Sequence, residues 1–275
     1  MYQNQRTIAS TITVSGSGIH TGQKVNLVIQ QSTVNSGVKF WFTSGGGIRL
    51  LPRNAFAQKR GTNLSKVQKK VKTVEHFLAA LSAKGITNLR VIFANDGEVQ
   101  EMPILDGCAQ EWTRLLDQAG VVEQEALQRP LIIEEPIQVW SEDRYIKIEP
   151  AEKLSVTCLV EFPIIGKSEA TYISGETDFA KEIAPARTFG FEAELKELEA
   201  SGLAKGATIE NALLIKDDGS YSTPLRFPNE PARHKLLDVL GDIYTLGRPV
   251  VGRITAYKPG HALNVSFVKR IAGMG

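Results

Sequence analysis

Two stretches of the sequence share one pattern: EHFLAAL at residues 75–81 and RHKLLDVL at residues 233–240. Each has a histidine at its second position, followed by apolar residues at helical spacing. The first run is apolar all round, as in a helix covered on both sides, whereas the second has one apolar face. Each then leads through a glycine, Gly85 or Gly247, into a strand-like run, NLRVIF at 88–93 or VVGRITAY at 250–257. The repeated order of helix, glycine and strand indicates two similar halves, with the two histidine-bearing helices meeting at their junction.

Strand patterns before each helix extend this repeat to whole domains. Apolar residues alternate with polar ones over 24–29 in the first half and over 154–162 in the second, as half-buried strands require. A chain of 275 residues is long enough for two domains. We therefore expect an α+β protein of two similar domains, each with a β-sheet layered against helices. The expected boundaries are an N-terminal domain over 1–124, a linker over 125–130 and a C-terminal domain over 131–275.

Composition and charge narrow the class of protein. Hydrophobic residues make up 42% of the chain and charged residues 23%, which suits a folded protein with a solvated surface. The formal net charge of +2 argues against nucleic acid as the main partner, because duplex binding requires basic residues clustered on one face. The one dense basic run, residues 66–72, is interpreted either as a solvated loop or as a segment that steers an anionic substrate.

The chain start and the cysteines point to the cytoplasm. Residues 1–7 lack the apolar core of a secretory signal, and no apolar run approaches the roughly 20 residues that span a bilayer. Cys108 and Cys158 cannot build a disulfide framework, and they lack the CxxC spacing of a thiolate zinc site. We expect a cytoplasmic protein without a transmembrane segment, whose contact with any membrane would be peripheral.

The second histidine-bearing helix carries a polar stripe opposite its apolar face. At 100° per residue, the stripe contains His234, Asp238, Asp242 and Thr245. His234 and Asp238 are four residues apart and therefore lie one above the other, close enough to bind one ion. A catalytic zinc typically has three protein ligands and one open position, and His76 from the first helix would complete the set. The alternative is an ordinary solvated polar face.

Glu75 stands directly beside the first candidate ligand. Zinc lowers the pKa of bound water to about 7, and a neighbouring carboxylate can then accept the water proton as a general base. The order of residues differs from the HExxH motif, since the glutamate precedes His76 and no second histidine follows at the required spacing. A metalloprotease is therefore disfavoured.

Three further polar residues lie in turns. His261 follows a strand in a tight turn, where a histidine alone is usually only exposed. His20 lies in a glycine-rich turn, and we assign it no catalytic role. Thr188, in the turn before a helical segment over 192–200, can offer a hydroxyl to a developing oxyanion, although the turn alone is equally consistent with a structural role.

Taken together, the sequence resembles the family of UDP-3-O-acyl-N-acetylglucosamine deacetylases. No single motif is decisive, but six matching segments follow one another in family order over nearly the whole chain. The segments are Ser17–Gly22, Thr73–His76, Pro103–Gly107, Ala186–Phe191, Arg233–Asp238 and Gly260–Asn264.

The resemblance implies a β-α-α-β sandwich with the active site between the two domains. It implies zinc, or iron in its place, on His76, His234 and Asp238, with Glu75 as the base that activates water. His261 matches the general acid and electrostatic stabiliser, Asp242 the carboxylate that orients it, and Thr188 the hydroxyl near the oxyanion.

The resemblance also implies a set of substrate-binding residues. Lys235 matches a polar substrate contact, Phe189 and Phe191 fall where the family contacts the sugar and the nucleotide, and Phe162 matches an aromatic that stacks on uracil. An insert at about 190–215 corresponds to an apolar tunnel for the acyl chain. Its candidate tunnel residues, each equally well explained by ordinary packing, are Leu198, Leu203, Ala204 and Ile209. Asn63 stands where many members carry a cysteine near the metal, which bears on accessory or inhibitory metal binding.

We therefore predict a monomeric, cytoplasmic zinc deacetylase that acts on an acylated UDP-amino sugar in the committed step of lipid A biosynthesis. Two alternatives remain open from the sequence. One is a zinc amidohydrolase with an unacylated sugar substrate, and the other is a non-catalytic homologue that binds a nucleotide sugar or a lipid. The presence of Glu75 and all three candidate ligands favours the enzyme over the second alternative.

Overall fold

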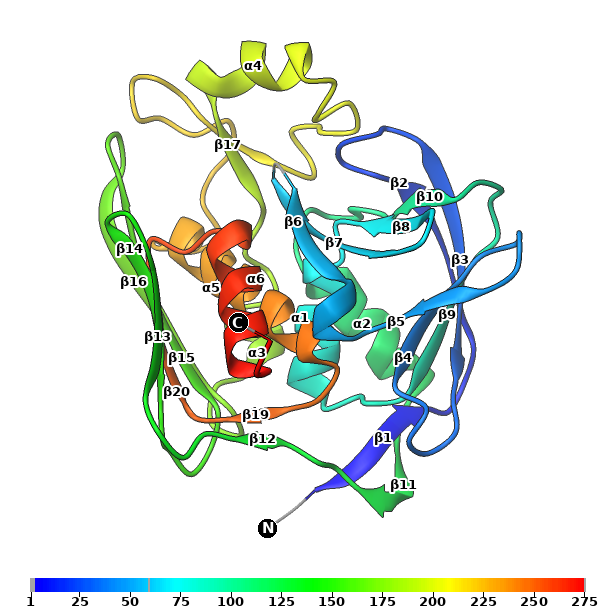
Figure 1. The fold of residues 1–275 in the computed structure, drawn as a ribbon. Helices are drawn as coiled ribbons and strands as arrows, with labels where there is room; N and C mark the ends of the chain where they lie inside the picture. Colours follow the sequence, from blue (N-terminus) through cyan, green and yellow to red (C-terminus); the bar gives the residue numbers. More distant parts are fainter. Residues whose placement is uncertain (1–2, 59, 275) are drawn as a thin grey trace.

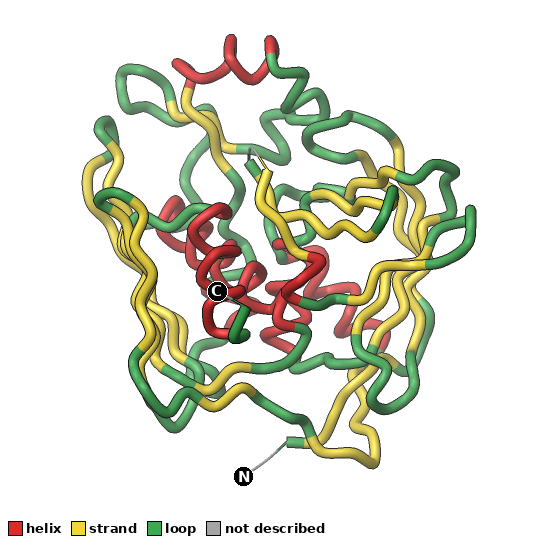
Figure 2. The backbone as a smooth tube through the Cα atoms, in the orientation of Figure 1, coloured by secondary structure: helices red, strands yellow, loops and turns green. Residues whose placement is uncertain are grey.

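The computed structural model describes residues 3–58 and 60–274. Two five-stranded sheets form the outer layers, and the main helices lie between them (Figures 1 and 2). The N-terminal sheet has the order β2-β3-β9-β4-β5 and the C-terminal sheet the order β13-β14-β20-β15-β16. The α+β sandwich of two similar domains that the sequence predicts is confirmed.

The two large sheets share one topology. In the first, the strand that follows the helix, β9 (Leu89–Phe93), lies antiparallel to β3 (Lys24–Gln31) and parallel to β4 (Val38–Trp41). In the second, β20 (Arg253–Tyr257) lies antiparallel to β14 (Arg144–Glu149) and parallel to β15 (Ser155–Phe162). The remaining strands of the two sheets are β2 (Ile12–Ser17), β5 (Gly47–Arg49), β13 (Ile137–Ser141) and β16 (Gly166–Ile173).

Smaller strand pairs connect and extend this frame. A four-stranded sheet contains β6 (Ala55–Gln58), β7 (Gly61–Lys66), β8 (Lys69–Lys72) and β10 (Val99–Glu101). The two-stranded pairs are β1 (Asn4–Ile8) with β11 (Val121–Leu127), β12 (Leu131–Ile132) with β19 (Val250–Val251), and β17 (Phe189–Phe191) with β18 (Leu213–Ile215). Strand β11 ends inside the stretch 125–130, and the division into domains at that stretch stays a prediction.

Two helices meet at the centre of the molecule, α1 (Glu75–Lys84) and α5 (Glu230–Ile243). Residues 75–81 of α1 are all buried, which agrees with a helix covered on both sides. The other helices are α2 (Gln110–Ala119), α3 (Phe179–Glu182), α4 (Leu195–Ala200) and α6 (His261–Ile271). None of the helices in the described ranges is long and apolar enough to cross a membrane.

Two local predictions were wrong. A threonine just before an apolar helical run predicts a helix N-cap, but Thr73 is not the N-cap of α1. Val74 holds that position without a side-chain cap, and Thr73 adopts a positive φ of 54°. His261 does not lie in a turn but is the first residue of α6, after Gly260. In both cases long-range contacts, which local sequence does not display, decide the backbone conformation.

Gly241 allows α1 and α5 to approach each other closely. A Cβ atom at this position would lie 2.0 Å from the backbone oxygen of Glu75. We expect Gly241→Ala to lower the free energy of unfolding by about 1–3 kcal/mol, the usual range for overpacking, despite alanine's higher helix propensity. Denaturant unfolding checks this. Gly190→Ala is the control, because its added Cβ would meet nothing within 4 Å, and an equal loss in both variants would contradict the prediction.

Candidate active site

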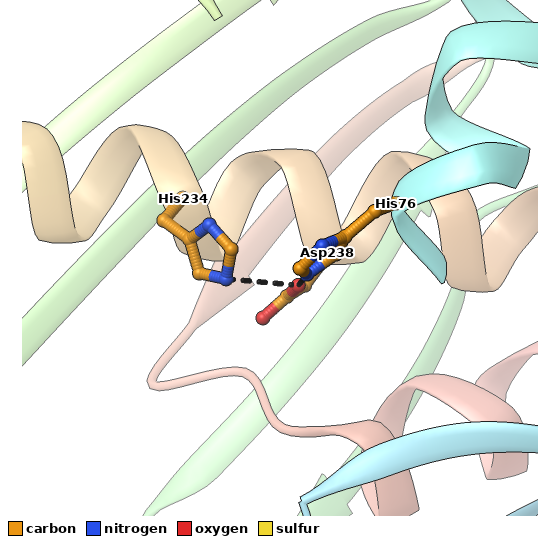
Figure 3. A group of neighbouring side chains, drawn as sticks. All are labelled: His76, His234 and Asp238. Atoms are coloured by element: carbon orange, nitrogen blue, oxygen red, sulfur yellow. Dashed lines mark ion pairs between the residues drawn. The ribbon is translucent and has the colours of Figure 1, made fainter. Parts of the chain in front are cut away.

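Three candidate metal ligands from the two halves converge in the buried interior. His76 comes from the first turn of α1, and His234 and Asp238 lie on one face of α5 (Figure 3). Oδ1 of Asp238 is 3.4 Å from Nε2 of His234 and 3.7 Å from Nε2 of His76. All three ligand atoms lie within 4.8 Å of one another.

The three side chains fit a metal better than they fit one another. Tetrahedral ligands at about 2.0–2.1 Å from zinc are about 3.4 Å apart, which is near the observed separations and too long for good hydrogen bonds. Oδ1 of Asp238 is buried without a hydrogen-bond partner in the described chain. His234 Nδ1 lies 3.0 Å from the backbone oxygen of Ala186, which orients its Nε2 toward the group as in other metal-binding histidines.

The charge states of the group also suit a cation. Burial lowers the pKa of both imidazoles, that of His76 to about 3, so both are neutral near pH 7. Burial alone would raise the pKa of Asp238, but Lys235 and the nearby histidines hold it below its usual range. The Lys235 Nζ donates to Oδ2 of Asp238 at 2.8 Å, which leaves Oδ1 free to bind an ion.

Glu75 lies beside the metal group with its carboxylate held in one orientation. Its Oε2 accepts a hydrogen bond from the backbone N–H of Thr62 at 3.0 Å, and its Oε1 is 3.9 Å from Nε2 of His261. Burial raises the pKa of Glu75 to about 8, while His261 opposes the shift. A carboxylate with a raised pKa in a cavity is a stronger base near neutral pH than an exposed one.

His261 and Asp242 form a second pair close to both Glu75 and Asp238. Nδ1 of His261 is 2.9 Å from Oδ2 of Asp242, which also accepts from the Asn264 amide at 2.7 Å. Burial would lower the pKa of His261, but the carboxylates of Asp242 and Glu75 raise it to about 9. His261 is therefore a proton donor near neutral pH, and its Nε2 lies 3.9 Å from Oδ2 of Asp238.

A cavity of about 290 Å³ joins these groups to the insert. Its polar end is lined by Glu75, the three metal-group residues, His261, Thr188 and Lys235. Its other end is apolar and is formed largely by residues of the insert, among them Leu195, Leu198, Ala204, Ile209 and Leu213. The cavity can therefore receive a molecule with a polar reacting group and a long apolar chain.

Most, but not all, of the predicted substrate-binding residues line this cavity. Phe189 lies in its wall, and the Lys235 Nζ is 5.4 Å from the Phe189 ring centroid. Phe162 and Phe191 are not among the lining residues; they pack on each other with ring centroids 5.3 Å apart. Leu203 is likewise absent from the lining.

The structure adds a carboxylate that the sequence reasoning did not find, Glu101. It is 4% exposed and accepts hydrogen bonds from the backbone N–H groups of His20 and Thr21 and from the hydroxyls of Thr21 and Thr73. It thereby ties the wall of the cavity near His20 to the start of α1. Asn63 also holds the backbone just before α1, because its Oδ1 accepts a hydrogen bond from the backbone N–H of Thr73 at 3.1 Å. Nothing in the local sequence indicates these long-range contacts.

A buried ion pair holds the segment that carries Thr188. Arg187 donates to both carboxylate oxygens of Glu230, at 2.8 and 3.0 Å, at the start of α5. In the chain, Arg187 stands between Ala186, whose backbone oxygen orients His234, and Thr188. Sequence reasoning missed it because the two residues are 43 positions apart.

The insert closes the cavity against the N-terminal half. The backbone N–H of Gly206 donates to the oxygen of Ile19 at 3.0 Å. A Cβ at Gly206 would lie 2.3 Å from the oxygen of Gly18, so only glycine permits this approach. His20, which sequence reasoning left without a role, lines the cavity beside this contact.

Comparison with known proteins agrees with this geometry. A UDP-3-O-acyl N-acetylglycosamine deacetylase family model matches residues 5–273. Relatives named UDP-3-O-acyl-N-acetylglucosamine deacetylase include one from Myxococcus xanthus, 39% identical over 98% of this chain and 86% of its own length. Another, from Thermosynechococcus vestitus, is 38% identical over 98% of this chain and 94% of its own length. A third, from Campylobacter fetus, is 36% identical over 94% of this chain and 88% of its own length. The chain belongs to the UDP-3-O-acyl N-acetylglycosamine deacetylase family.

Proposed function

We propose that this protein hydrolyses the N-acetyl group of UDP-3-O-acyl-N-acetylglucosamine, releasing acetate in the committed step of lipid A biosynthesis. The observation that carries the proposal is the cavity in which a His-His-Asp group and Glu75 face an apolar channel. Family membership supports the same reaction, since the relatives named above are deacetylases of this substrate. We further propose that the protein works as a monomer in the cytoplasm.

His76, His234 and Asp238 would hold one divalent ion, and the mixed nitrogen and oxygen donors suit Zn²⁺, with Fe²⁺ as the alternative. When bound, such an ion acts as a Lewis acid that lowers the pKa of a water molecule and polarises a carbonyl group. The protein's own groups perform the proton transfers. Glu75 accepts the proton of the attacking water, and its hydrogen bond from Thr62 keeps the carboxylate in place.

His261 and Thr188 act on the other side of the amide. The Asp242 carboxylate keeps the His261 imidazolium charged and oriented, so it stabilises negative charge that develops on the carbonyl oxygen. The Thr188 hydroxyl adds a hydrogen-bond donor at the same oxygen. His261, or Glu75 in its place, then donates a proton to the amine as it leaves.

The apolar end of the cavity would hold the acyl chain, and Lys235 and Phe189 the sugar. We expect kcat/KM for the acylated UDP-sugar to exceed that for the unacylated one by at least about 100-fold. Burial of about four methylenes of the acyl chain would stabilise the bound transition state by about 0.8 kcal/mol each. An acetate-release assay on both substrates checks this. Equal rates would instead favour an amidohydrolase of unacylated sugars.

The same assay has a matched pair of variants. Leu198→Glu should raise KM for the acylated substrate alone, because Leu198 lines the cavity. Leu203→Glu is the control, since Leu203 lies in the same insert but outside the lining and its N–H donates to the oxygen of Leu198. Equal effects of the two changes would argue against an acyl chain in this channel.

A further inference from the structure

A basic hollow of about 400 Å³ lies on the N-terminal half, away from the active-site cavity. Four cations line it: Lys39, Arg49, Arg53 and Lys66. No acidic side chain is among its described lining residues, and no ion pair in the described part of the chain neutralises any of the four. The hollow shares no lining residue with the active-site cavity.

Two of the four cations of the hollow lie where they repel each other. Lys39 on β4 lies directly opposite Arg49 on β5 in the antiparallel register. Like charges in such a cross-strand pair destabilise a sheet. A nearby lysine shows the contrast, because the Nζ of Lys69 is paired with Glu98 at 2.6 Å. Arg49 donates a hydrogen bond to the backbone oxygen of Asn35 at 3.4 Å, but no acidic side chain among the described lining residues offsets the charge of the four cations. This excess of positive charge suits an external anion.

An exposed valine protrudes beside this hollow. Lys66 and Lys69 face each other across the hairpin of β7 and β8, so Val67 and Gln68 form its two-residue loop. Val67 is 92% exposed and has a φ of 58°. Asparagine or glycine is the usual residue at such a position, because a β-branched side chain is strained at positive φ. The valine therefore adds strain to the hairpin and gains almost no packing in return.

The hairpin and the hollow form one surface. The Lys69 Nζ donates to the Ser44 hydroxyl at 2.6 Å, which ties the hairpin to the turn between β4 and β5 (Figure 1). Trp41, at the end of β4, also lines the hollow, and the guanidinium of Arg90 lies 5.0 Å from its ring centroid. A tryptophan, an exposed aliphatic tip and several cations are the combination that binds the interface of an anionic membrane.

We propose that the docking surface made of Lys39, Trp41, Arg49, Arg53, Lys66 and Val67 binds membranes that contain anionic phospholipids. The cations contact headgroup phosphates, and Val67 enters the boundary of the acyl layer. A nucleic acid or an acidic protein would satisfy the cations, but neither would account for an exposed, strained valine at the tip.

Sedimentation of the metal-loaded protein with lipid vesicles tests the proposal. We expect binding to vesicles of phosphatidylcholine mixed with phosphatidylglycerol, little binding to phosphatidylcholine alone, and release by high salt. The double variant Lys39→Glu, Arg49→Glu should weaken binding at least about tenfold. The control, Lys167→Glu with Lys181→Glu, makes the same charge change on exposed lysines of the C-terminal half and should retain most of the binding.

Val67→Asn separates docking from folding. Asparagine tolerates the left-handed φ, so this variant should keep or raise the melting temperature and yet bind anionic vesicles more weakly. All of these variants should keep wild-type turnover on substrate in solution. The proposal is overturned if the protein ignores anionic vesicles, if the control weakens binding equally, or if Val67→Asn binds them as the wild type does. Binding only to inorganic phosphate or RNA would likewise refute it.

Discussion

Glu75→Ala should lower kcat at least about 1,000-fold while the protein still binds its metal. Glu75 precedes His76, its carboxylate is placed to accept the water proton, and general-base catalysis contributes about 10²–10⁴-fold. Acetate release and metal content, measured on the same preparation, check the two parts of the prediction. Near-normal turnover would exclude Glu75 as the base.

Glu75→Gln serves as the conservative control for this variant. Glutamine keeps the size of the side chain and an oxygen that can accept the Thr62 N–H bond, but it cannot take up a proton. It should therefore retain the stability of the wild type and lose activity as fully as the alanine variant. High activity in Glu75→Gln together with low activity in Glu75→Ala would indicate a packing role instead.

Asp238→Ala should weaken metal binding at least about 100-fold and abolish activity with it. Even residues that only orient metal ligands contribute about 10–100-fold to affinity, and Asp238 is placed as a ligand itself. His234→Ala should behave alike. Metal content after dialysis and competition with a chelator measure the affinity. The metal-free protein should also unfold at a lower temperature, because an ion that binds only the folded state stabilises it.

His20→Ala is the matched control for the ligand variants. His20 lines the same cavity, but it lies outside the His-His-Asp group. This variant should keep one metal ion per chain. If Asp238→Ala retained its metal as well as His20→Ala does, the ion would have to lie elsewhere.

The sequence was most informative where function follows helical spacing. The four-residue interval between His234 and Asp238 predicted their shared face, and the repeated helix, glycine and strand predicted the common topology of the two sheets. Asp242 was placed on the same stripe, and the structure brings it to His261. Regular periods translate directly into geometry, so these features could be predicted before any coordinates.

The contacts that orient the site could not be predicted in this way. Glu101 joins Thr21 and Thr73 across 80 and 28 residues, and Arg187 reaches Glu230 across 43. Such pairs depend on tertiary packing, which leaves no periodic signal in one sequence. The helix that begins at His261 was missed because local pattern does not reveal which neighbour a segment packs against. The resemblance placed Leu203 in the tunnel wall, but a likeness between segments does not fix which side chain faces the cavity.

We expect one metal ion to join the two halves of the protein. An anomalous difference map, from crystals of the zinc-loaded protein measured at the zinc absorption edge, would locate this ion. It should contain a single strong peak among Nε2 of His76, Nε2 of His234 and Oδ1 of Asp238. A map without a peak there, or with its main peak at another set of side chains, would contradict this expectation.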